Sequence, residues 1–156
     1  MRSRSPITTQ GGSILLEALI AILLFSMGML ALAGVQAAAI KNAADAKNRA
    51  EASFLANQII AQMWAENPAN LAAYRHNPTT VARCNYAGGA SGNGNVVAWL
   101  GNAGSPGTVA GNLPNAGSNR QQIMVEANNV VTVTICWQNP SDPAPRSFVG
   151  VAQING

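Results

Sequence analysis

The sequence predicts an α+β fold, in which a small antiparallel sheet packs on the second half of one long N-terminal helix. Three observations predict it: residues 18–40 carry no charge, no proline occurs between Pro6 and Pro68, and residues 130–137 alternate apolar and polar side chains. The first two indicate a continuous helix whose first half spans a membrane, and the third indicates a strand. Composition divides the chain into a short basic leader (1–12), an apolar helix (13–40), an amphipathic helix half (41–67) and a head (68–156).

The apolar half of the helix is long enough to cross a bilayer. Residues 18–40 are 23 in number and would span about 34 Å as a helix, against a hydrocarbon core of about 30 Å. Continued to Glu66, the helix would be about 81 Å long. No domain of 156 residues can bury such a helix over its whole length. The first half must therefore be buried in something else.

The second half of the helix reads as amphipathic. Leu55, Ile59 and Met63 recur at every fourth position, and Lys47 and other charged residues precede them on the same half of the helix. This spacing predicts one apolar stripe on a water-exposed helix. The pair 67–68, Asn-Pro, is expected to end it.

Beyond the helix, short apolar runs predict strands. Residues 122–126, 130–137 and 148–154 read as three strands, with a turn at 127–129. Nine of the fifteen glycines lie between residues 88 and 117, which indicates a long loop region with a short strand at 96–100. We expect the three tryptophans in the core rather than at a ligand site: Trp64, Trp99 and Trp137.

The two cysteines, Cys84 and Cys136, favour a disulfide over a metal site. His76 is the only histidine of the chain, and a zinc site needs three or four ligands at recognisable spacing. A disulfide between Cys84 and Cys136 is expected if the head lies outside the cytoplasm. On the chain-entropy model it would stabilise the fold by about 4 kcal/mol.

Charge and chemistry exclude other classes of protein. Without Arg2 and Arg4 of the leader, seven basic residues face six acidic ones, too few to hold a nucleic-acid backbone, so nucleic acid is not an expected partner. The only carboxylates beyond the long helix are Glu126 and Asp142, and no order of residues suggests a nucleophile. We expect no enzyme and no cofactor.

The most informative residues lie where the leader meets the helix. Gly12 ends the leader, the apolar helix begins at Ser13, and Glu17 is its fifth residue. A carboxylate at the start of a membrane span is costly unless it is paired. A positive α-amino group, created by cleavage between Gly12 and Ser13 on this chain or on a neighbour, would be such a partner.

This arrangement resembles the class III signal of type IV prepilins and of type II secretion pseudopilins. Residues 26–36 and the Ala-rich helix that follows are similar to minor pilins of the PilV type. The resemblance implies a pilin-like lollipop fold, cleavage by prepilin peptidase after Gly12, N-methylation of Ser13, and subunit alignment by Glu17. Two positions depart from the family. Ser13 stands at a position where the family usually has Phe, and Gly34 stands at a position where many major pilins have proline.

The resemblance also implies a setting. The chain would be a single-pass protein of the bacterial inner membrane with its head in the periplasm, and would then enter a pilus filament. Its partners would be other major and minor pilins through the N-terminal helix, the inner-membrane assembly platform, the prepilin peptidase and the lipid bilayer.

Other interpretations remain open from the sequence. A type II secretion minor pseudopilin shares the pattern. A tip adhesin or DNA-uptake pilin would bind through the head, whose arginines are sparse: Arg75, Arg83, Arg120 and Arg146. An ordinary secretory signal, cleaved after an Ala-x-Ala at 31–33 or 37–39, would be shorter than this apolar run. In a plain membrane anchor, Glu17 would be incidental.

Overall fold

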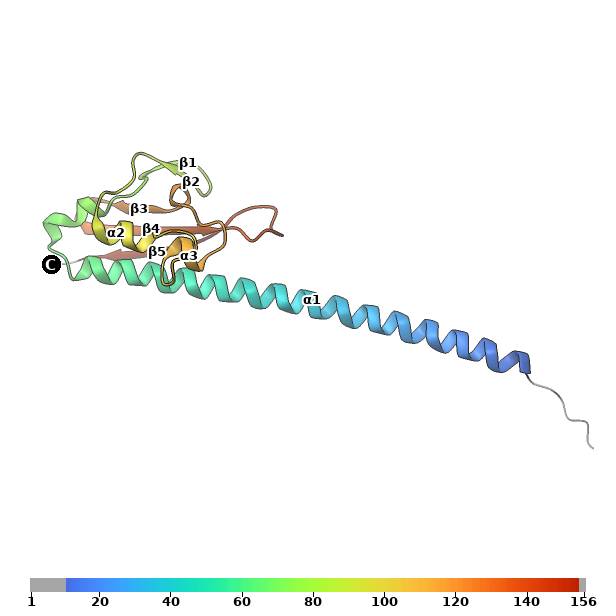
Figure 1. Ribbon diagram of the computed structural model, residues 1–156. Helices are drawn as coiled ribbons and strands as arrows, with labels where there is room; N and C mark the ends of the chain where they lie inside the picture. The colour runs from blue at the N-terminus through green and yellow to red at the C-terminus, as the bar shows by residue number, and fades with distance from the viewer. Residues whose placement is uncertain (1–10, 155–156) are drawn as a thin grey trace, which may run out of the picture. The chain divides into compact units, whose positions relative to one another are not determined.

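The computed structural model describes residues 11–154, with the side chain of Gly11 left out. The chain forms two compact units that divide between Ala44 and Asp45, and helix α1 (Gly11–Trp64) belongs to both (Figure 1). All described residues of the first unit are helical. Residues 1–10 of the predicted leader lie outside the described residues.

The second unit holds the rest of α1 and ten shorter elements. They are, in chain order, η1 (Pro68–Tyr74), β1 (Thr79–Ala82), β2 (Asn85–Ala87), α2 (Gly94–Leu100), α3 (Val109–Asn112), η2 (Ser118–Arg120), β3 (Gln122–Val125), η3 (Ala127–Asn129), β4 (Val130–Trp137) and β5 (Arg146–Gln153).

An antiparallel sheet of strand order β3-β4-β5 packs on the C-terminal part of α1. The predicted stripe on α1, including Leu55, Ile59 and Met63, is completely buried. It meets the alternate residues of β4 that the sequence assigned to one face, including Val131, Val133 and Ile135. The predicted α+β fold, a long helix with a small antiparallel sheet on its second half, is confirmed.

Gly150 of the edge strand β5 faces helix α1, and the space beside it is the size of a methyl group. A Cβ at Gly150 would lie 3.4 Å from Cδ1 of Ile60 and 3.5 Å from Cβ of Ala56. Both contacts are at or near van der Waals distance, so a methyl group would fill the available space. The three predicted strands are confirmed to within two residues, and 127–129 forms the turn between β3 and β4, in which Asn128 and Asn129 have positive φ.

The predicted strand at 96–100 is wrong, because residues 94–100 form helix α2. The Asn93 side chain accepts hydrogen bonds from the backbone N–H groups of Asn95 and Val96, which caps the helix. Val96 and Trp99 are three residues apart and both buried, a helical spacing. A run of five residues is too short to distinguish the 3.6-residue period of a helix from the two-residue period of a strand.

One of the three tryptophans is also not where the sequence placed it. Trp99 and Trp137 are buried in the core, but half of the Trp64 surface is exposed, at the last residue of α1. The helix ends at Trp64, three residues before Asn67, and the Asn67 side chain instead caps η1 by accepting from the N–H of Ala69.

Candidate functional site

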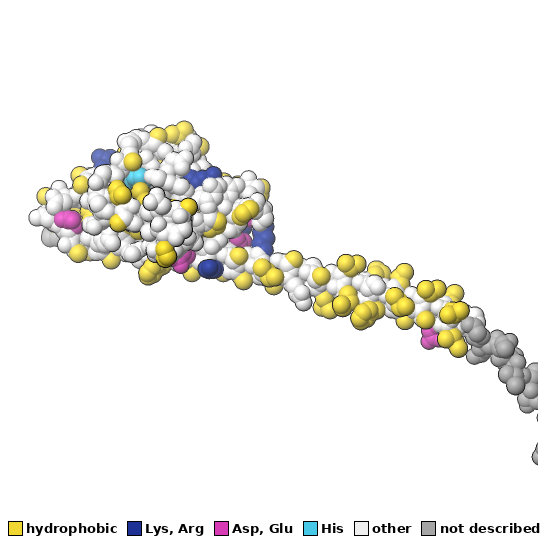
Figure 2. Space-filling model, in the orientation of Figure 1, with side chains coloured by type: hydrophobic (Ala, Val, Ile, Leu, Met, Phe, Trp, Pro, Cys, Tyr) yellow, Lys and Arg dark blue, Asp and Glu magenta, His cyan; other side chains and the backbone are white. Residues whose placement is uncertain are grey.

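The first candidate site is the N-terminal part of α1, whose apolar side chains have no cover. Every residue from 12 to 44 is exposed, and large side chains such as Leu30 and Ile40 show more than 70% of their surface. Figure 2 shows hydrophobic side chains along this part of the helix. Among the described residues, α1 is the one helix long and apolar enough to span a membrane. It is suited to be a single-pass membrane anchor.

The glycines of this segment have no packing role inside the chain. A Cβ at Gly12, Gly28 or Gly34 would meet nothing within 4 Å. Glycine inside a helix destabilises it by about 0.5–1 kcal/mol relative to alanine. The described fold therefore gives no packing reason for glycine at these three positions.

The predicted cleavage and alignment residues lie together at the start of α1. Gly12 and Ser13 are in its first turn, and Glu17 lies one turn further on. All three are exposed, and no hydrogen bond or ion pair joins Glu17 to another described residue. The roles of Gly12, Ser13 and Glu17 stay predictions.

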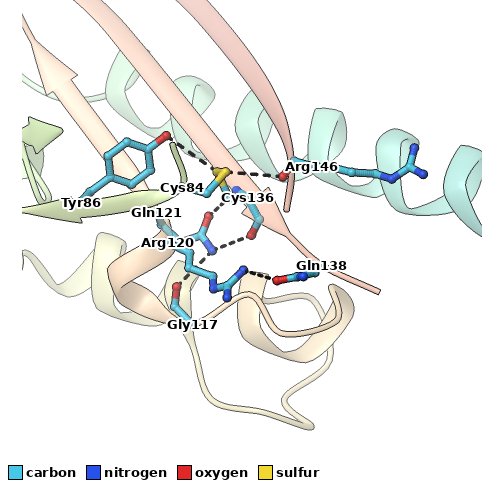
Figure 3. The surroundings of a disulfide bond; sticks show 8 residues. All are labelled: Cys84, Tyr86, Gly117, Arg120, Gln121, Cys136, Gln138 and Arg146. Atoms are coloured by element: carbon cyan, nitrogen blue, oxygen red, sulfur yellow. Dashed lines mark hydrogen bonds between the residues drawn. A yellow bond between two sulfur atoms is a disulfide. The ribbon is translucent and has the colours of Figure 1, made fainter. Parts of the chain in front are cut away.

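The predicted disulfide between Cys84 and Cys136 is confirmed. It joins two residues 52 positions apart in the sequence, with their Cα atoms 5.7 Å apart. Cys84 lies in the turn between β1 and β2, and Cys136 is on β4 (Figure 3). The bond ties the β1–β2 hairpin, which sequence analysis missed, to β4. Burial raises the pKa of the neighbouring Tyr86 hydroxyl, which lies 3.7 Å from Sγ of Cys136.

A buried glutamine supports the same strand. The Gln121 side-chain amide donates to the carbonyl oxygen of Cys136 at 3.0 Å and accepts from its N–H at 3.0 Å. The same amide nitrogen lies 3.2 Å from the carbonyl oxygen of Gly117 (Figure 3). Gln121 thus satisfies both backbone groups of Cys136, where β3 no longer pairs with β4.

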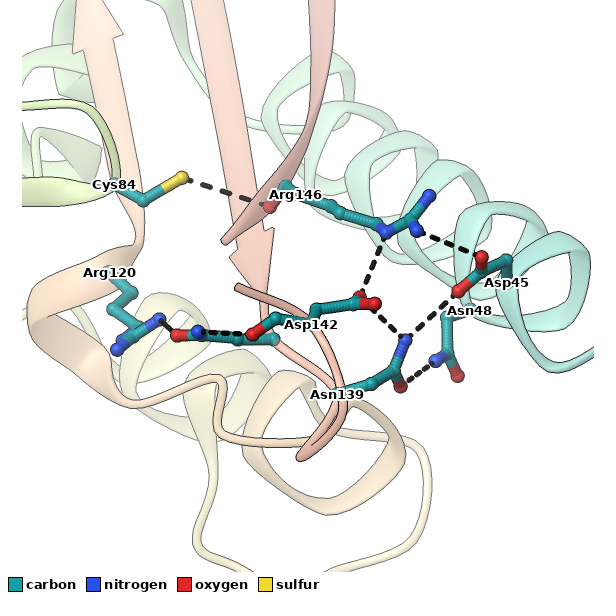
Figure 4. A network of polar contacts seen from close by, with 8 residues as sticks. Asp45, Asn48, Cys84, Arg120, Asn139, Asp142 and Arg146 are labelled. Carbon is teal, nitrogen blue, oxygen red and sulfur yellow. Dashed lines mark hydrogen bonds and ion pairs between the residues drawn. The ribbon is translucent and has the colours of Figure 1, made fainter. Parts of the chain in front are cut away.

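A polar network holds the β4–β5 connection to α1. Arg146 pairs with Asp45 on α1 and with Asp142, each at 2.9 Å (Figure 4). Asn139 donates to both of these carboxylates and accepts a hydrogen bond from Asn48 of α1. The hydrogen bond that Arg146 donates to the Asp142 carboxylate raises the pKa of Arg146. Sequence analysis missed the network because its members are up to 101 positions apart in the chain.

His76 is fully buried and fixes the segments around it. Its Nδ1 accepts from the backbone N–H of Ser91 at 3.1 Å, so Nε2 carries the proton and donates to the Ser118 carbonyl oxygen at 3.0 Å. Its backbone pairs with Ile123 of β3. Burial lowers the pKa of His76, and the Ser118 contact only partly offsets this. The sequence carries no sign of this role, because the partners lie 15 and 42 positions away.

Within residues 11–154, no group of three or more His, Cys, Asp or Glu side chains could hold a metal ion. No protein-family model, curated protein or solved structure matches the chain. The functional interpretation therefore depends on the residues and on their geometry.

Proposed function

We propose that this chain is a minor pilin of a type IV pilus, which is processed by prepilin peptidase and then assembles into, primes or modifies the filament. In this proposal, cleavage follows Gly12, Ser13 becomes the methylated N-terminus, and Glu17 aligns the subunit with its neighbours. The single observation that carries the proposal is the conjunction of Gly12, Ser13 and Glu17 at the start of an exposed apolar helix.

The exposure of α1 supports assembly as well as anchoring. Large apolar side chains that show half or more of their surface all along a helix require an apolar environment. A bilayer provides one before assembly, and a bundle of similar helices in a filament core provides another. The helix can pass from one to the other without exposure to water.

The unexplained glycines support contacts with other molecules. A peptidase must approach the backbone closely at the bond that it cuts, and a side chain at position 12 would obstruct this approach. Gly28 and Gly34 would likewise let neighbouring helices come near. Their six-residue spacing is not that of a GxxxG dimer motif.

Processing at Gly12–Ser13 tests the proposal directly. Mass spectrometry of the protein from bacterial membranes should find a mature chain that begins at methylated Ser13. Gly12→Leu should leave the precursor uncut, whereas the matched change Gly28→Leu, also at an open helical position, should leave cleavage unaffected. A mature N-terminus near Gly34 or Ile40 would instead establish a secretory signal and contradict the proposal.

A further inference from the structure

We infer that the second unit binds the phosphate of an anionic phospholipid headgroup in a pocket lined by arginines. The pocket has a volume of about 400 Å³ and is lined by Asp45, Ala46, Arg49, Arg83, Trp137, Arg146 and Ser147. Its three arginines come from α1, from the β1–β2 turn and from the start of β5. This convergence of three separate elements gives the pocket its basic character.

Two of the three arginines are available to a ligand. Asp45 and Asp142 pair with Arg146, which leaves that side chain held in place. No hydrogen bond or ion pair joins the side chains of Arg49 or Arg83 to other described residues. The three arginines together with Asp45 and Asp142 carry a net charge of +1, and a guanidinium binds phosphate oxygens through two parallel N–H groups.

Trp137 forms a wall of the pocket and has an unused donor. The residue is 2% exposed, and its indole Nε1 has no hydrogen-bond partner among the described residues. A buried N–H without an acceptor costs free energy. Because Trp137 lines the pocket, an anion bound there would bring acceptor oxygens next to this residue. The donors around the pocket thus favour a ligand that carries several oxygen atoms and negative charge.

The place of these residues in the chain favours a lipid as the source of the phosphate. Asp45 and Arg49 are on the same helix as the apolar run that ends at Ile40, five and nine residues further on. Nine residues of helix rise about 14 Å, whereas the headgroup layer on one side of a bilayer is roughly 5–8 Å thick. An arginine side chain can extend back over this difference. The inference rests on the proposed insertion of α1 in a membrane.

Titration of the full chain with water-soluble lipids tests the inference. The chain, in zwitterionic micelles, is titrated with dihexanoylphosphatidylglycerol while the three indole ¹H–¹⁵N resonances are followed. We expect a saturable shift of the Trp137 resonance. The Trp99 resonance should not move, because its indole N–H already donates to the Leu55 carbonyl oxygen at 2.9 Å. Dihexanoylphosphatidylcholine should produce no such shift, and inorganic phosphate should bind at least tenfold more weakly.

Variants of arginines inside and outside the pocket assign the binding to the pocket. Arg49→Gln together with Arg83→Gln should raise the half-saturating concentration at least tenfold. Neither side chain holds the fold through a hydrogen bond, so an unmoved Trp99 resonance would verify that the double variant is folded. Arg75→Gln removes an arginine outside the pocket and should change the half-saturating concentration less than twofold.

Three results would overturn the inference: no shift of Trp137, an equal response to phosphatidylcholine, or an equal effect of Arg75→Gln. Inorganic phosphate binding as tightly as the lipid would show a general anion site and refute the lipid source. The titration needs neither cleavage at Gly12 nor filaments, so failure of the proposed pilin function would leave its result unchanged.

Discussion

Single residues in the head do structural work that their sequence context does not reveal. His76 and Gln121 are both completely buried, and each joins segments that are remote in the chain. A buried polar side chain is stable only when its donors and acceptors are paired. The Gly- and Asn-rich region around them contains no charged residue from 85 to 119, so its order depends on such neutral hydrogen bonds.

The burial of His76 predicts a dependence of stability on pH. Because burial lowers the pKa of His76 in the folded state below the ordinary histidine value of about 6.5, the unfolded chain binds the proton more readily. The free energy of unfolding should therefore be fully retained above pH 6.5 and should fall as the pH is lowered toward the folded-state pKa, by up to about 1.4 kcal/mol per pH unit. Urea unfolding in mild detergent between pH 8 and pH 5 measures this slope.

His76→Gln is the control for this prediction. It removes the titrating group and should lower stability at pH 8 while reducing the slope between pH 6.5 and 5. Glu66, whose pKa is lowered chiefly by its hydrogen bond with Asn70, titrates below 4.5, outside this range. An identical slope in the variant and the parent chain would assign the pH dependence to other groups.

At the scale of elements, the head depends on connections that bind irregular segments to a short sheet. The disulfide fixes the two-stranded hairpin to β4, and the Asp45–Arg146 pair fixes the start of β5 to α1. Hairpins of this size are marginal when isolated in water. The hairpin is therefore expected to depend on Cys84 for its order.

Loss of the disulfide should lower stability substantially. The double variant Cys84→Ser, Cys136→Ser should reduce the free energy of unfolding by about 2–5 kcal/mol, because the 52-residue separation leaves a long loop unconstrained in the unfolded chain. Denaturant unfolding monitored by tryptophan fluorescence measures the loss. A reducing agent should destabilise the parent chain by a similar amount and leave the double variant unchanged. Equal stability of oxidised and reduced parent chains would contradict the prediction.

The elements that could be predicted are those with a long, regular pattern. Period-four burial on α1 and alternation on β4 identified the core, because each pattern extends over eight residues or more. The hairpin and α2 could not be predicted in the same way. In the sequence, the short apolar run of Val96, Trp99 and Leu100 fits either a strand or one turn of helix. In the structure the run is helical, and the indole N–H of Trp99 donates a hydrogen bond to the Leu55 carbonyl oxygen of α1.

The pocket residues were beyond prediction for a related reason. Arg49, Arg83 and Arg146 looked sparse in the sequence, since 34 and 63 positions separate them. The pairing of β4 with β5, the disulfide and the packing of the sheet on α1 together bring all three to one place. In contrast, the motif at Gly12, Ser13 and Glu17 is contiguous, so it could be recognised without any tertiary structure.

At the scale of the whole molecule, one helix serves two different environments. From Asp45 onward, α1 buries one face in the core of the head, whereas every described residue from 12 to 44 is exposed. Only the first part carries a carboxylate within an apolar sequence. Whether that carboxylate acts in assembly or is incidental to anchoring is the point on which the proposed function depends.

Substitution of Glu17 separates assembly from anchoring. If the chain is only tethered, Glu17→Leu should be neutral or should improve membrane retention, because a charge in a membrane span is costly. If the chain assembles, the variant leaves a buried α-amino group without its partner. Breaking one side of such a pair costs about 3–5 kcal/mol, a factor of several hundred or more in an assembly equilibrium.

Glu17→Leu should therefore still insert in the membrane but fail to enter filaments or to support their formation, whereas Gln36→Leu, a polar-to-apolar change on the same helix, should assemble normally. Immunoblots of sheared filaments and of membranes, from strains that carry only the variant, measure both properties. Normal filament number with normal incorporation of Glu17→Leu would remove the carboxylate from the mechanism and leave a membrane anchor as the function of α1.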